Sequence, residues 1–340
     1  MKTELIKVTQ KNKKEIISKA ADLIKKGEVV AFPTETVYGL GANAFNDKAI
    51  QKIFIAKGRP SDNPLIVHIS DLKQLNELVE VVPKKAKLLM KKYWPGPLTI
   101  VMKKSLLVPL SVTAGLNTVA VRMPSNKIAL ELIKKSGFPL AAPSANSSTK
   151  PSPTMAKHVM DDLNGKIPLI LDGGTCDIGV ESTVIGLVGE KPILFRPGKV
   201  TLEDLKKVLG EIDSAKPALN SASVSSSAPS SPGMKYTHYA PKAKVFLFST
   251  KKELLSLIKK ESSVFAEKKC LLLGINHFGL NGCKEITFKD VKEYTKNVFS
   301  KFREADEQKY DIIFVQKVKE EKLGLALMNR LKKSSVNSEN

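Results

Sequence analysis

Short apolar runs alternate with amphipathic stretches over residues 1–210. Runs such as "VVAF" (29–32), "LIVHI" (65–69), "LTIVMK" (98–103), "TVAVRM" (118–123) and "LILDGG" (169–174) have the length and composition of buried strands. Between them, "DKAIQKIFIAKGR" (47–59), "PKKAKLLMKKYW" (83–94) and "NKIALELIKKSG" (126–137) have helical spacing and end near glycine or follow proline. This alternation predicts an α/β domain with a twisted sheet covered by helices.

The pattern stops at residues 214–232, "SAKPALNSASVSSSAPSSP", where serine, alanine and proline replace large apolar residues. Such a composition is typical of a flexible linker. We therefore predict a large N-terminal domain over residues 1–213 and a linker or lid over 214–242 that ends in "HYAPKA". A small domain over 243–332 and a tail over 333–340 follow.

The small domain repeats strand-like and helix-like patterns about three times, from "KVFLFS" to "LGLALMNRLKK". Alternation of this kind predicts a small Rossmann-like parallel sheet. Its glycine-rich stretch "LGINHFGLNG" has neither GxGxxG nor GxxxxGK[ST] spacing, so no nucleotide site is expected there.

The formal charge of the 340 residues is +21, which favours anionic ligands such as nucleotides, phosphates or RNA. Single lysine runs such as "KNKKE" also fit ordinary solvated helix faces. No stretch approaches the roughly 18 apolar residues of a membrane span, and the N-terminal segment lacks an apolar signal core. The sequence therefore predicts a cytoplasmic protein.

Cysteine and histidine spacing does not indicate a protein-held metal. Cys176, Cys270 and Cys283 are odd in number and form no CxxC pair, so reduced structural thiols are expected rather than a disulfide frame. The four histidines also lack metal-pair spacing.

Candidate chemistry lies at the ends of the predicted strands and helices, where "AKGRPSDNP" brings Lys57 and Arg59 together just before Pro60. In an extended segment, i and i+2 side chains point the same way and could bind a polyphosphate together. Basic residues at a helix C-terminus, favoured by the dipole, are the alternative.

Arg122 is a single arginine in the apolar run "TVAVRM" and needs an anionic partner. Its planar fork suits a ligand carboxylate, and an internal salt bridge is the alternative. Hydroxyls and amides follow in "APSANSSTKPSPT", and "GVESTV" and "FRPG" add Ser182, Thr183 and Arg196 at strand ends. Such groups could cradle phosphate or ribose, although an ordinary polar loop has the same composition.

Seven segments occur in one order: "FPTETVYGLGANA", "KGRPSDNPLIVH", "WPGPLTIV", "TVAVRMP", "APSANSS", "GVESTVI" and "LFRPG". Together they resemble the YrdC-like family, and "SPGMKYTHYAPKA" is similar to the linker end of its long two-domain form, the threonylcarbamoyl-adenylate synthases. The resemblance is strong over about residues 10–210 and in "HYAPKA", and only in outline over the last hundred residues. Thr237 departs from the pattern, since a basic residue often stands there.

The resemblance implies a YrdC-like twisted mixed sheet and a reaction. L-Threonine, bicarbonate and ATP would give threonylcarbamoyl-adenylate and pyrophosphate, for the modification of adenosine 37 in tRNA. Mg²⁺ would accompany ATP, and a tRNA threonylcarbamoyl transferase machinery would be a transient partner. A YrdC-like module that binds double-stranded RNA without catalysis is the alternative. A carbamoyl-phosphate-dependent maturation factor is a second rival, but its acylphosphatase and zinc-finger segments are absent from the sequence.

The resemblance also implies residue roles. Lys57 and Arg59, the KxR pair, would be catalytic and hold the ATP phosphates. Ser144 and Asn146, the SxN pair, would complete that site. The full ATP-binding set would be Lys57, Arg59, Asn63, Thr118, Ser144, Asn146, Ser152, Arg196, Tyr236 and His238. The threonine-binding set would be Thr34, Thr36, His68, Arg122, Ala142 through its backbone, and Ser182.

Overall fold

The computed structural model describes residues 1–215, 239–260 and 268–336. The chain divides into two compact units. The first comprises Met1–Ser148 and Ser152–Tyr236, and the second comprises Thr149–Pro151 and Thr237–Asn340.

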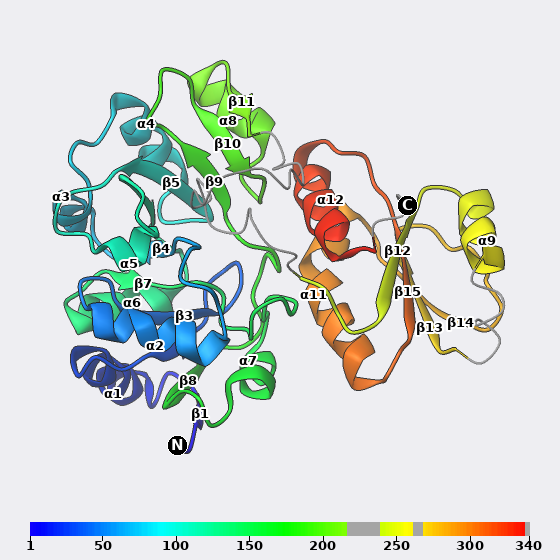
Figure 1. Ribbon diagram of the computed structural model, residues 1–340, viewed down its shortest axis with the longest axis horizontal. Coiled ribbons are helices and arrows are strands. Elements are labelled where there is room, and N and C mark those ends of the chain that lie inside the picture. Colours follow the sequence, from blue (N-terminus) through cyan, green and yellow to red (C-terminus); the bar gives the residue numbers. More distant parts are fainter. Residues whose placement is uncertain (216–238, 261–267, 337–340) are drawn as a thin grey trace. The chain divides into compact units, whose positions relative to one another are not determined.

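The first unit contains an eleven-stranded mixed sheet in the order β1-β8-β2-β3-β7-β4-β6-β5-β9-β10-β11 (Figure 1). Its strands are β1 (Glu4–Lys7), β2 (Val30–Phe32), β3 (Gly39–Asn43), β4 (Ile66–His68), β5 (Leu98–Lys103), β6 (Thr118–Arg122), β7 (Leu140–Ala141), β8 (Leu169–Asp172), β9 (Thr183–Gly186), β10 (Ile193–Arg196) and β11 (Asp213–Ser214). Parallel pairs such as β4–β6 and β5–β9 occur beside antiparallel pairs such as β5–β6 and β9–β10. The predicted twisted mixed sheet is confirmed.

Inner strands of this sheet such as β2 and β8 are buried on both faces, to which successive side chains of a strand point in turn. Val30 and Phe32 of β2 pack in one apolar cluster, with α1 and α6, whereas Ala31 packs in the other. Leu169 and Leu171 of β8 belong to the first cluster in the same way. Strands buried on two faces lose polar alternation, which explains the nearly continuous apolar runs of the sequence.

Helices cover both faces: α1 (Lys13–Lys25), α2 (Asp47–Lys57), η1 (Leu72–Gln74), α3 (Leu75–Leu78), α4 (Lys84–Tyr93), α5 (Leu110–Thr113), α6 (Lys127–Ser136), α7 (Ala156–Leu163) and α8 (Leu202–Leu209). Asn46 caps α2 at its N-terminus by accepting a hydrogen bond from the Ala49 N–H, and Gly58 ends it in the left-handed conformation at φ 59°. A residue without Cβ takes that conformation at no steric cost, so the predicted helix end at this glycine is confirmed.

The second unit contains a four-stranded parallel sheet in the order β12-β15-β13-β14. Its elements are β12 (Lys244–Phe248), α9 (Lys251–Lys260), β13 (Cys270–Gly274), β14 (Cys283–Thr287), α11 (Val291–Glu307), β15 (Ile312–Gln316) and α12 (Lys322–Ser334). The parallel sheet and its helices make the small Rossmann-like α/β domain that the sequence predicts, although a loop rather than a helix joins β13 to β14.

The expectation of three reduced cysteines is wrong. Cys270 and Cys283 form a disulfide, with their Cα atoms 4.9 Å apart, and Cys176 is free and buried. The two cysteines begin the neighbouring parallel strands β13 and β14 and face each other in register. Strand pairing, which cysteine spacing does not reveal, therefore brings the thiols together.

The division into a catalytic domain, a linker or lid, a small domain and a tail stays a prediction. Most of the linker, including Tyr236 and His238, lies outside the described residues. In the part of the chain that is described, no helix is both long and apolar enough to cross a membrane.

Candidate active site

The turn that directly follows β2 carries Thr34 and Thr36, both of them almost fully buried. The Thr34 hydroxyl donates to the Val37 carbonyl oxygen at 2.6 Å and lies 2.8 Å from the Thr36 hydroxyl. The N–H groups of Thr36 and Val37 both donate back to the Thr34 oxygen. The short hydroxyl side chains thus replace water for a buried turn and fix the backbone between them.

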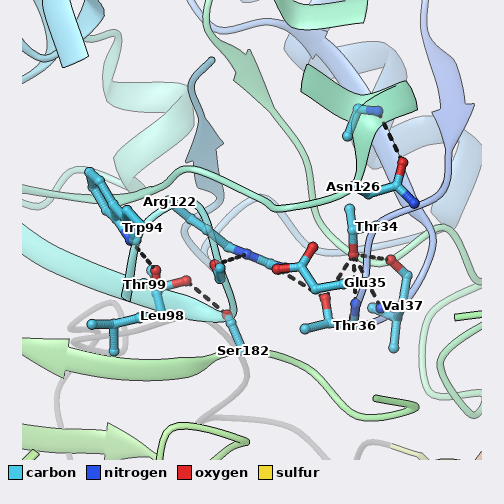
Figure 2. Close-up of polar contacts among 12 residues, drawn as sticks. Thr34, Glu35, Thr36, Val37, Trp94, Leu98, Thr99, Arg122, Asn126 and Ser182 are labelled. Carbon is cyan, nitrogen blue, oxygen red and sulfur yellow. Dashed lines mark hydrogen bonds and ion pairs between the residues drawn. The ribbon is translucent and has the colours of Figure 1, made fainter. Parts of the chain in front are cut away.

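Arg122 at the end of β6 lies beside this turn (Figure 2). Its Nη1 donates to the Thr36 hydroxyl oxygen at 2.9 Å, and its Nη2 lies 2.7 Å from Oε1 of Glu35. Arg122 and Glu35 are only 4% and 7% exposed. The internal salt bridge considered for Arg122 is therefore present, whereas its contact with a ligand carboxylate stays a prediction.

His68 stands next to Arg122, because β4 and β6 run parallel and bring the two residues into register. Burial, with a smaller contribution from the Arg122 charge, lowers the pKa of His68 to about 3. The imidazole is therefore neutral at physiological pH, which leaves Arg122 as the cation of this pair.

Ser182 belongs to a second group of polar side chains, which includes Thr99 at the start of β5. The hydroxyls of Ser182 and Thr99 lie 2.8 Å apart, and Arg196 donates from Nε to the Ser182 carbonyl oxygen and from Nη2 to its hydroxyl oxygen. The backbone of Gly198 passes so close that a Cβ there would lie 2.4 Å from the Thr183 nitrogen. This close approach explains why glycine ends the motif "FRPG" beside "EST".

Lys57 connects the end of α2 to the loop after β7. Its ammonium donates to the carbonyl oxygens of Ser144 and Asn146, the latter at 2.6 Å, and more weakly to the Asn146 side-chain oxygen at 3.4 Å. In that loop the Ser144 hydroxyl donates to the Asn146 side-chain oxygen at 2.6 Å. The KxR and SxN motifs therefore meet at one place.

The proposed geometry of the KxR pair is wrong in one respect. Lys57 is the last residue of α2 and Gly58 turns the chain, so Lys57 and Arg59 do not lie on an extended segment. Arg59 reaches the carbonyl oxygens of Asn63 and Pro64 at 3.4 Å each. The glycine that ends the helix, rather than strand alternation, sets the direction of Arg59.

The remaining predicted residues lie on the same sheet or its loops. The Ser152 hydroxyl donates to a Glu181 carboxylate oxygen, and both residues are buried. The Ala142 N–H donates to the Ile66 carbonyl oxygen, and Asn63 is fully buried. Thr118 lines a separate hollow on the sheet together with Val101, Leu116, Gly186 and Phe195. Tyr236 and His238 are outside the described residues.

Sequence reasoning gave no role to Glu35, Glu181 or Thr99. Glu35 stands between the two threonines of "PTET", a position that could have indicated a buried carboxylate in the site. No group of three or more His, Cys, Asp or Glu residues able to hold a metal occurs within the described ranges.

Comparisons with known proteins cover almost the whole chain. A family model described as telomere recombination matches residues 22–198, and one described as threonylcarbamoyl-AMP synthase, C-terminal domain, matches residues 200–336. Threonylcarbamoyl-AMP synthase of Pyrococcus abyssi is 47% identical over 335 residues, 98% of each chain. The Bacillus subtilis protein of that name is 46% identical over 325 residues, 94% of this chain and 92% of its own.

A solved structure agrees with these sequence matches. The crystal structure of P. abyssi Sua5 complexed with L-threonine superposes with a TM-score of 0.90 at 47% identity, and the match covers 98% of each chain. Both units of the present chain therefore have counterparts in one relative. The chain belongs to the threonylcarbamoyl-AMP synthase family.

Proposed function

We propose that this protein makes threonylcarbamoyl-adenylate and pyrophosphate from L-threonine, bicarbonate and ATP. The observation that carries the proposal is the match over nearly the full length to relatives named threonylcarbamoyl-AMP synthase. The reaction makes the proposed enzyme a nucleotidyltransferase. Its product would pass to the machinery that modifies adenosine 37 of tRNA, and direct contact with that machinery or with RNA is part of the proposal.

Threonine would bind at the buried turn beside Arg122. A guanidinium carries five N–H donors, and Arg122 directs Nε to the Gly96 carbonyl oxygen and Nη1 to Thr36. The remaining donors of its terminal nitrogens suit the substrate carboxylate, which accepts two parallel bonds well. Thr34, Thr36, neutral His68, Ser182 and the Ala142 backbone would surround the rest of the amino acid.

ATP would bind where Lys57 meets the loop that carries Ser144 and Asn146. Two of the ammonium contacts are short bonds to carbonyl oxygens, and the third, to the Asn146 side chain, is long. A phosphate oxygen could replace that third contact without releasing the loop. The other proposed ATP contacts are Arg59, Asn63, Thr118, Ser152, Arg196, Tyr236 and His238.

The chemistry would proceed through carbamate formation on the threonine amine, followed by attack of the carbamate oxygen on the α-phosphorus with pyrophosphate leaving. Lys57 and Arg59 would stabilise the charge on the phosphates, and Arg122 would orient the amino acid. Mg²⁺ would accompany ATP and would supply charge neutralisation at its phosphates.

The test is pyrophosphate release, measured with ATP and with threonine and bicarbonate added or omitted one at a time. We expect turnover only when both are present, and release that needs neither would overturn the proposal. Lys57→Ala should lower turnover roughly ten- to a hundredfold, because one charge-assisted bond to phosphate is lost. Lys48→Ala, an exposed lysine on the same helix, is the matched control and should leave turnover unchanged.

A further inference from the structure

Three buried side chains at the threonine end of the site have polar atoms without a hydrogen-bond partner among the described residues. These atoms are both carboxylate oxygens of Glu35, Nη2 of Arg122 and Nδ1 of His68. Buried polar groups are nearly always hydrogen-bonded, so unsatisfied atoms gathered at one place need an explanation. One explanation is a binding site whose hydrogen bonds are completed only by its ligand.

Glu35 is the unexpected member of this group. Its Oε1 lies 2.7 Å from Nη2 of Arg122, yet the two atoms are not aligned for a hydrogen bond. Other buried carboxylates of this unit have donors: Glu181 accepts from the Ser152 hydroxyl, and Asp162 accepts from the Ser147 N–H. Glu35 therefore has room for a donor that the described chain does not supply.

The charges of this cluster are complementary to a free amino acid. His68 is neutral, so Arg122 supplies one positive charge and Glu35 one negative charge, side by side. A zwitterionic amino acid carries the same two charges on one carbon atom. Binding of the ligand carboxylate at Arg122 brings the ligand ammonium group next to Glu35. Each charge of the ligand then lies beside the opposite charge of the protein.

We propose that Glu35 binds the α-ammonium group of threonine and takes a proton from it. This inference rests on the proposed function and adds the general base that the reaction needs. An ammonium nitrogen has no lone pair, so it cannot form a carbamate until it loses a proton.

The ammonium N–H bond breaks, its proton passes to a Glu35 oxygen, and the amine keeps the electron pair. The amine then attacks the bicarbonate carbon, so that a C–N bond forms, a C–O bond breaks and water leaves. The product is the carbamate anion, whose oxygen is the nucleophile for the α-phosphorus. The proton on Glu35 returns to solvent when the product departs.

Other groups that face Glu35 come from neighbouring strands and loops. Arg122 projects from β6 and contacts both Glu35 and the Thr36 hydroxyl of the turn. Cys176 lies on the loop after β8, and its thiol pKa is raised by burial and then by the Glu35 charge. A thiol held in its neutral form cannot serve as the base, and burial weakens His68 as a base by lowering its pKa to about 3. Glu35 is the carboxylate of this cluster that can accept the proton.

The first test measures binding rather than turnover. Threonine and 2,3-dihydroxybutyrate, which has a hydroxyl in place of the α-amine, are each titrated calorimetrically into the protein and into Glu35→Gln. We expect the protein to prefer threonine by roughly ten- to a hundredfold, the worth of one charge-assisted bond, and Glu35→Gln to lose that preference. Equal binding of the two ligands by the unaltered protein would overturn the proposal.

Glutamine keeps the size of the side chain and removes its charge. Tighter threonine binding by Glu35→Gln would mean that Glu35 competes with the substrate carboxylate for Arg122, which would also overturn the proposal. Glu285→Gln, a carboxylate in the second unit that accepts N–H groups of Phe278 and Gly279, is the matched control. It should bind both ligands as the parent does.

The second test is the pH profile of turnover. Without the base, only threonine whose amine is already deprotonated can react, so turnover of Glu35→Gln should rise about tenfold per pH unit between about pH 7 and 8.5. The parent should vary much less, and parallel profiles would exclude proton transfer to Glu35. If Glu35→Gln does not fold, Glu35→Asp keeps the charge and should retain the ligand preference.

These tests separate the two proposals. A parent that binds threonine better than dihydroxybutyrate but releases no pyrophosphate keeps Glu35 as the ammonium site and refutes the proposed function. A parent that releases pyrophosphate but binds the two ligands equally well keeps the proposed function and refutes Glu35 as the ammonium site.

Discussion

The buried pair of Arg122 and Glu35 should dominate the stability of the first unit near its site. Replacing Arg122 by methionine fills much of the same space but leaves the Glu35 carboxylate buried and without a counter-charge. Breaking a buried ion pair on one side costs about 3–5 kcal/mol, because the remaining charge is desolvated without compensation. Both side chains are less than a tenth exposed, so solvent cannot screen this charge effectively.

The double variant Arg122→Met with Glu35→Gln should recover most of that loss, since neither charge then stays buried alone. The coupling between the two substitutions should therefore be at least about 2 kcal/mol, at the upper end of the range for residues in direct contact. A mere loss of packing at each position would instead give additive costs.

Urea unfolding followed by tryptophan fluorescence measures this directly. Trp94 is the single tryptophan of the chain and lies in the first unit, where its indole N–H donates to the Leu98 carbonyl oxygen at 2.6 Å. Its signal therefore reports the unit that contains the pair, whatever the second unit does. An Arg122→Met cost below about 1 kcal/mol, the range of exposed pairs, would refute the reasoning.

The pKa of His68 is about 3 in the folded protein and about 6.5 when unfolded, so protonation favours the unfolded state. The free energy of unfolding should therefore fall by about 1.4 kcal/mol per pH unit below about pH 6.5. Urea unfolding of His68→Gln should lack this part of the decline, and an unchanged decline would contradict the prediction. Reduction of the Cys270–Cys283 disulfide should lower the free energy of unfolding of the second unit by about 3 kcal/mol, the loop-closure value for about 15 residues. Calorimetry measures this loss, and the Trp94 signal should stay unchanged. Three titratable thiols in the denatured, unreduced protein would exclude the bond. Deleting residues 221–227 should leave threonine-dependent pyrophosphate release nearly intact. Replacing Tyr236, His238 and Tyr239 together by alanine should almost abolish that release. An active triple variant would show that the segment around Tyr236–Tyr239 is only a tether.

Local patterns along the chain are enough to predict the class of each unit. Apolar runs of strand length between helical patterns predict an α/β fold, because a strand buried on both faces has no polar alternation to show. Helix ends were also predictable: Gly58 ends α2 because a left-handed residue favours glycine, and this is a local property of the chain. The ordered motifs similarly indicated which residues gather, and Lys57 does meet the loop of Ser144 and Asn146.

Which charged and reactive groups become partners depends on the folded sheet and could not be predicted. Whether Arg122 would pair within the protein was undecided in the sequence, because its partner Glu35 lies on a turn after β2 that reaches it only when the sheet forms. The disulfide was missed for the same reason, since parallel strand register brings Cys270 and Cys283 face to face. Local rules describe the few residues on either side of a position, whereas contacts across a sheet depend on the order and register of strands, which no short stretch of sequence encodes.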